Sequence, residues 1–143
     1  MRTVRLCLIG VAFSLMLVGI VSGTPLRHLV QVLPIGLALR LASRSPGSLG
    51  AYAAVSLFAF WMLVMVLIWF FLLGLSDIAS GQYAPAEVAL TIPIAFFCSV
   101  GLLRGIRAGR LLGRARRIAT VAAFWVVQTG VMVVSLVEPV VSR

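Results

Sequence analysis

The charged residues of this chain avoid its long apolar stretches and gather at the ends of them. All twelve basic residues are arginines, and six of them fall within the fourteen positions from 104 to 117. The three acidic residues, Asp77, Glu87 and Glu138, lie at the opposite ends of the same stretches. Because charge is costly in a bilayer and arginines gather on its cytoplasmic side, this distribution is typical of a polytopic membrane protein.

The composition excludes an ordinary soluble domain. Apolar residues make up 62% of the chain and charged residues only 10%, whereas a soluble domain is about 25% charged. The net charge of +9 would suit a nucleic-acid binder, but such a protein carries its basic patch on a soluble scaffold. We therefore expect a single integral membrane domain over residues 1–143, with anionic lipid headgroups and not nucleic acid against the arginines.

Four stretches are predicted to cross the membrane as helices. They are apolar, and the longest has twenty-seven residues without a charge, more than the twenty or so that a crossing needs. Their ranges are 6–22, 49–75, 85–103 and 118–137. A cleaved signal peptide over residues 1–23 is an alternative for the first, because a basic start precedes an apolar run and small residues.

Residues 24–44 are ambiguous. The uncharged part, Leu29 to Leu39, is only eleven residues long and contains Gln31 and Pro34. Such a length suits a short, kinked or interfacial helix as well as a crossing. The predicted fold is an all-α bundle of five transmembrane helices, with four as the alternative.

The arginines also predict an orientation. With the 104–117 loop in the cytoplasm, the 76–87 loop and the C-terminus lie outside. Five crossings place ten arginines inside and leave only Arg27 and Arg143 outside, whereas four crossings give nine against three. The five-crossing arrangement is favoured, and we expect it in a bacterial inner membrane.

The arginine-rich loop is predicted to contact anionic lipid. By spacing, one helical face carries Arg107, Arg110, Arg114 and Arg117. The expected arrangement is a cytoplasmic helical hairpin anchored by anionic lipid. A voltage sensor is disfavoured because no crossing carries an acid near its middle. The residues expected to contact lipid headgroups are Arg104, Arg107, Arg110, Arg114 and Arg117.

Small residues follow a helical spacing beside these arginines. Gly101, Gly105, Gly109 and Gly113 recur at every fourth position, a spacing that lets two helix backbones approach closely. Gly101 and Gly105 are thus predicted to form a packing groove, within the chain or in an oligomer. The alternative is a flexible glycine-rich loop.

Polar residues suggest two further sites. At the outer rim, His28, Asp77, Tyr83 and Glu87 are candidates for a small catalytic or cation-binding group, the alternative being helix caps and solvated loop residues. Gln128, near the centre of the last stretch, needs a buried partner, for which Trp61 and Ser99 are the candidates. A lining position for a polar substrate is the alternative role of Gln128.

No cofactor, metal or catalytic residue is assigned. The single histidine cannot clamp a haem from both sides within one chain, and Cys7 and Cys98 lack a metal-ligand spacing. The expected function is therefore that of a small, non-catalytic membrane protein that packs against itself or a larger membrane partner. The alternatives are a small oligomeric transporter or channel for a neutral or lipidic substrate, and a membrane enzyme that uses the outer rim.

Overall fold

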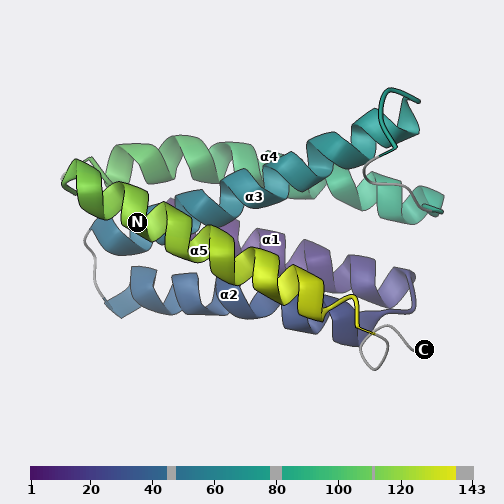
Figure 1. The fold of residues 1–143 in the computed structure, drawn as a ribbon, viewed down its shortest axis with the longest axis horizontal. Coiled ribbons are helices and arrows are strands. Elements are labelled where there is room, and N and C mark those ends of the chain that lie inside the picture. Colours follow the sequence, from purple (N-terminus) through teal and green to yellow (C-terminus); the bar gives the residue numbers. More distant parts are fainter. Residues whose placement is uncertain (45–47, 78–81, 111, 138–143) are drawn as a thin grey trace.

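The described part of the chain, in a computed structural model, comprises residues 1–44, 48–77, 82–110 and 112–137. It forms five helices and is all-helical, as predicted. Successive helices run in opposite directions, side by side along the length of a bundle (Figure 1). Their bounds are Arg2–Val21 for α1, Pro25–Arg44 for α2, Ser48–Leu72 for α3, Pro85–Ala108 for α4 and Arg114–Val134 for α5.

Four of the helices are long and apolar enough to cross a membrane. They are α1, α3 from Leu49 onward, α4 and α5, which contain 20 to 25 residues each. At 1.5 Å per residue they are about 30 to 37 Å long, close to the roughly 30 Å of a bilayer core. Their bounds differ from the expected ones mainly at the arginine-rich end. There α4 continues to Ala108 and α5 already begins at Arg114.

Helix α2 is less apolar than the other four, and by length and composition it is not among the helices that could cross a membrane. It is nevertheless not short, because it runs for 20 residues and continues through Pro34. It lies lengthwise beside α1 and α3 (Figure 1). Its buried face includes Gln31, Ile35 and Ala38, so the polar residue that weakened the sequence signal faces protein.

Helix α3 forms the centre of the bundle and packs against all four others. Small residues in its first half allow this: Ala51, Ala53 and Ala54 are fully buried. A Cβ added at Gly50 would lie only 2.6 Å from the Cα of Ala42 on α2. The backbones of α2 and α3 therefore approach closely, which fixes where the later helices can pack.

The turn between α1 and α2 depends on one glycine. Gly23 has a φ of 68°, in the left-handed region that costs other residues about 1–2 kcal/mol. The turn is closed by a hydrogen bond from the Thr24 N–H to the Gly19 carbonyl at 2.8 Å. A side chain at position 23 would therefore strain the turn between α1 and α2.

A Gly23→Ala variant should lower the free energy of unfolding by about 1 kcal/mol. The control is Gly36→Ala, because Gly36 is helical with no atom near its Cβ position. This control should gain up to about 1 kcal/mol from helix propensity. Thermal unfolding midpoints in detergent micelles compare the two, and shifts of the same sign and size would contradict the role of Gly23.

Candidate functional site

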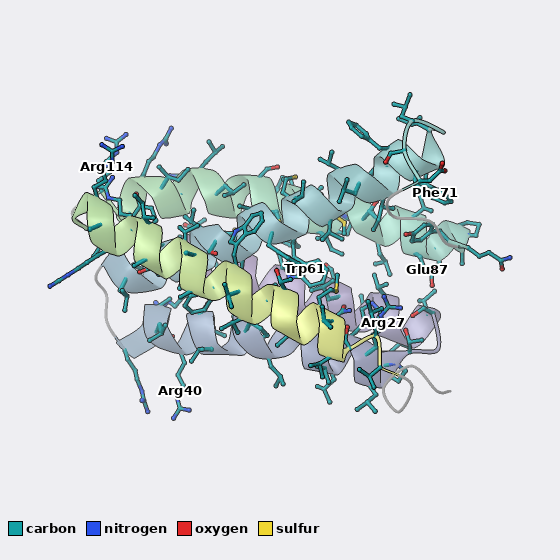
Figure 2. The ribbon with its side chains drawn as sticks, in the orientation of Figure 1. Arg27, Arg40, Trp61, Phe71, Glu87 and Arg114 are labelled. Carbon is teal, nitrogen blue, oxygen red and sulfur yellow. The ribbon has the colours of Figure 1, made fainter. Side chains whose placement is uncertain are left out.

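The arginines collect at one end of the bundle. Arg40 and Arg114 project from that end, and Arg27 and Glu87 lie at the other (Figure 2). The arginines of residues 104–117 lie on two helices, because α4 ends at Ala108 and α5 begins at Arg114. This is the arrangement of the expected helical hairpin, so no single helical face carries both Arg107 and Arg114. Gly109 and Gly113 stand at the two helix ends. Glycine is a weak helix former and common at helix ends, so it breaks the stripe.

Arg117 differs from the other arginines of this turn. Arg104, Arg107, Arg110 and Arg114 are exposed, whereas Arg117 is half-buried. Its Nε donates to the Leu112 carbonyl and its Nη2 to the Arg110 carbonyl. Its guanidinium also lies over the Tyr52 ring of α3, 5.4 Å from the centroid. Arg117 therefore fixes the turn to α3, and the contact with Tyr52 had no signal in the sequence.

Two glycines on α4 and the glycine that caps its end face α3 within the chain. A Cβ at Gly105 would lie 2.6 Å from Val55 Cγ2, and one at Gly101 would overlap the Phe58 ring. Gly109 faces the Tyr52 ring in the same way. Gly113, in contrast, has open space around it. The groove formed by Gly101 and Gly105 is thus filled by α3.

Gln128 is fully buried and joins α5 to α2. Its Nε2 donates to the backbone carbonyl of Gln31 over 3.4 Å. The side-chain amide of Gln31 in turn donates to Ser135 Oγ at 2.9 Å and lies 3.2 Å from Met132 Sδ. Sequence reasoning missed Gln31 as the partner, although Gln31 is the only residue of α2 with an amide side chain.

The two partners expected for Gln128 do not bond to it. Ser99 lies on an exposed face of α4 and donates to the Ala95 carbonyl of its own helix. Trp61 is 3% exposed, but neither its indole N–H nor the Gln128 Oε1 has a hydrogen-bond partner. The neighbouring Phe60 packs edge-to-face against Trp125 of α5, with 5.7 Å between ring centroids.

At the other end, His28 and Glu87 bond to their own turns. His28 Nδ1 lies 3.1 Å from the Thr24 carbonyl oxygen, and the side chain packs against Gly19. The Glu87 carboxylate accepts from the Ala84 N–H at 2.9 Å, where it also favours the positive end of the α4 dipole. These contacts are those of helix ends.

Tyr83 and Asp77 complete the outer rim. Asp77 is exposed just beyond α3, and the half-buried Tyr83 packs against Phe71 with 5.9 Å between ring centroids. Burial raises the pKa of Tyr83 above 10.0, while Arg27 lowers it and Glu87 raises it. Arg27, which was not among the predicted rim residues, thus lies near enough to Tyr83 to affect its pKa. Its Nε is buried without a hydrogen-bond partner.

The described side chains include no group of three His, Cys, Asp or Glu residues that could hold a metal. His28 bonds to the start of its own helix and packs against Gly19 of α1, and Glu87 bonds to the start of α4. Tyr83 lies in the loop before α4 and packs against Phe71 of α3. These contacts are thus those of neighbouring helix ends.

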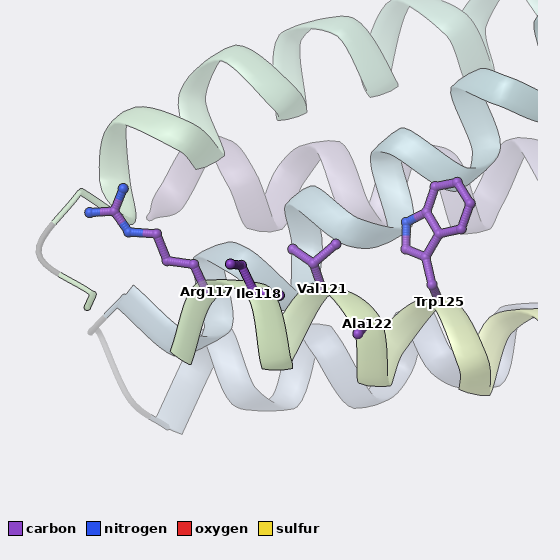
Figure 3. Close-up of a pocket in the computed structure, with 5 residues that line it drawn as sticks. All are labelled: Arg117, Ile118, Val121, Ala122 and Trp125. Atoms are coloured by element: carbon purple, nitrogen blue, oxygen red, sulfur yellow. The ribbon is translucent and has the colours of Figure 1, made fainter. Parts of the chain in front are cut away.

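A shallow, open groove of about 430 Å³ lies along one face of α5, and all five residues that line it belong to this helix. Arg117 is at one end and Trp125 at the other, with Val121 and Ala122 between them (Figure 3). The remaining lining residue is Ile118, so the apolar part follows a helical spacing of three and four residues. Sequence reasoning missed this groove because every one of these positions is ordinary in an apolar helix.

Comparisons with known protein families, with curated proteins and with solved structures gave no match. The class that the chain itself defines is a small all-helical protein, four of whose helices could cross a membrane. Its most distinctive described surface is the arginine-rich end, where the α4–α5 turn meets the groove of α5.

Proposed function

We propose that all five helices cross a bacterial inner membrane with the arginine-rich end in the cytoplasm. Support comes from the position of the ends of α2. Its last residues, Arg40 and Arg44, lie at the same end of the bundle as the start of α1 and the α4–α5 turn (Figures 1 and 2). This arrangement agrees with the enrichment of arginine on the cytoplasmic side.

The interior contacts of α2 support its inclusion among the crossings. A polar residue is tolerated inside a membrane when it faces other helices and finds a partner there. Gln31 is 2% exposed and bonds to Ser135 of α5. Arg27 and Arg40 stand near the two ends of the helix, where long side chains can reach the interface.

We further propose that the protein is non-catalytic and acts through helix packing, against itself or against a larger membrane partner. The observation that carries this proposal is the use of its polar side chains. Gln31 and Gln128 join α2 to α5, and His28 and Glu87 bond to their own helix ends. A transporter would use such groups along a path and an enzyme would direct them into one pocket.

The outer face of α5 is the surface best suited to such packing. Only Thr120, Phe124 and Gln128 of this helix are buried. Val126, on the opposite side, is 73% exposed. An apolar face of this kind meets either lipid tails or another helix.

Cysteine labelling tests the orientation. In a Cys7→Ala, Cys98→Ala background, Gln82→Cys should react with a membrane-impermeant maleimide in intact spheroplasts. Gly113→Cys and Thr3→Cys should react only after permeabilisation. Outside labelling of Thr3→Cys alone would reduce the crossings to four, and outside labelling of Gly113→Cys would reverse the orientation.

Photocrosslinking in native membranes tests the packing role. A photoreactive residue at Val126 should give a discrete protein adduct, whose mass shows whether the partner is a second copy or another protein. The same residue at Phe13, on the exposed face of α1, measures random collision. Equal adduct yields from the two positions would contradict a specific contact at α5.

A further inference from the structure

We propose that the groove on α5 binds one acyl chain of an anionic phospholipid, whose phosphate is held by the arginines around Arg117. The proposal rests on the proposed membrane location of the protein and names a specific ligand site within it. It goes beyond general attraction between arginines and a negative membrane surface, because it specifies which surface binds the acyl chain and which residues hold the headgroup.

The shape of the groove fits a lipid tail. From Arg117 to Trp125 the helix rises about 12 Å, close to the roughly 15 Å depth of one leaflet of the bilayer core. The surface between them consists of Ile118, Val121 and Ala122. The indole of Trp125 stands at the inner end (Figure 3). Its ring is held edge-to-face against Phe60 of α3, 5.7 Å between centroids.

The charge at the outer end fits a phosphate. The guanidinium of Arg117 is held by two backbone carbonyls, which orient it without neutralising its charge. Arg110 and Arg114 are exposed beside it. The two described acidic residues, Asp77 and Glu87, follow α3 and begin α4, away from this turn. Arginine binds phosphate oxygens through paired hydrogen bonds, so an anionic headgroup supplies the missing negative charge.

At the groove itself, this charge favours lipid over a second copy of the chain. Two copies that met through their grooves in the same orientation would bring two arginine-rich ends together on one side of the membrane. Like charges at such a contact oppose association. Val126, the position proposed to face a packing partner, does not line the groove.

A second groove, of about 290 Å³, repeats the pattern between α1 and α2. It combines Arg2 and Arg5 with the apolar residues Leu6, Ile9 and Leu39. We assign the lipid to the α5 groove because it is the larger of the two grooves and Trp125 stands at its inner end.

Native mass spectrometry of the full chain in detergent tests the site. Phosphatidylglycerol should bind at least tenfold more tightly than phosphatidylcholine with the same acyl chains. Ala122→Trp fills the groove and should weaken phosphatidylglycerol binding at least tenfold. Its control is Ala123→Trp, an exposed neighbour that does not line the groove and should leave binding unchanged.

Charge variants test the headgroup position. Arg117→Gln should weaken phosphatidylglycerol binding about fivefold, as expected for loss of one arginine at a membrane surface, and leave phosphatidylcholine unchanged. Arg114→Gln, which does not alter the bonds of the turn, should act in the same direction. Arg40→Gln removes an equal charge from α2 and should have little effect.

Equal binding of the two lipids, or equal effects of Ala122→Trp and Ala123→Trp, would overturn the proposal. So would a loss of dimers in Ala122→Trp with unchanged lipid binding, because the occupant would then be a second copy. Failure of the proposed orientation is detected separately. Outside labelling of Gly113→Cys with intact lipid selectivity would leave the site in place and move it to the other leaflet.

Discussion

Replacing Gly101 with leucine is expected to disrupt the packing of α4 on α3. The Cβ of the new side chain would overlap the Phe58 ring, which is 1% exposed and surrounded by packed residues. Overpacking of this kind costs about 1–3 kcal/mol, and more where the neighbour cannot move. The thermal unfolding midpoint in detergent micelles should therefore fall sharply, with loss of monodisperse protein.

Gly130→Leu is the matched control for this variant. Gly130 also lies inside a helix, but no atom stands near its Cβ position. Leucine has the better helix propensity by about 0.8 kcal/mol, so this control should be as stable as the parent chain or slightly more so. If both leucine variants unfolded at the same temperature, close packing of the glycine face could not be the cause.

Replacing Gln128 with glutamate is expected to prevent α5 from packing at neutral pH. The side chain is fully buried, and its Oε1 has no hydrogen-bond partner. A charged residue at the centre of a membrane helix costs about 3 kcal/mol or more. The side-chain amide of Gln31, on the helix that Gln128 contacts, is already bonded to Ser135. Protease sensitivity and the unfolding midpoint both measure the loss.

Gln128→Leu separates the charge from the shape of this side chain. It removes one weak hydrogen bond of 3.4 Å together with an unpaired buried oxygen. Exchange of such a pair for apolar atoms of similar size is close to neutral. A stable leucine variant beside an unstable glutamate variant is the expected result. Equal instability would mean that the amide itself holds α5 in place.

The helices were predictable because charged residues and the lengths of the apolar runs indicate where each helix begins and ends. Arginines and acids flank each run, and a run of twenty or more apolar residues has few alternatives to a membrane helix. The limits were least exact at the arginine-rich hairpin. There the helices extend into the expected loop as far as Gly109 and Gly113, which cap them on either side.

The side-chain partners were much less predictable. Gln31 and Gln128 are 97 residues apart, and a single sequence does not show which helices become neighbours. Trp61 was a reasonable partner for Gln128 by depth, but its indole N–H has no hydrogen-bond partner, and the neighbouring Phe60 contacts Trp125 of α5. Arg27 was not among the residues predicted for the outer rim, and only the fold brings it near enough to lower the pKa of Tyr83.

The bond between Gln31 and Ser135 has a consequence for biosynthesis. The two residues are 104 positions apart, so at about 5–20 residues per second the ribosome needs roughly 5–20 s to supply the second partner. During that interval α2 has an unpaired amide and only its earlier neighbours to shield it. Under the proposed five-crossing arrangement, α2 would stay beside the insertion machinery until α5 is made, and a truncated chain would leave its amide unshielded.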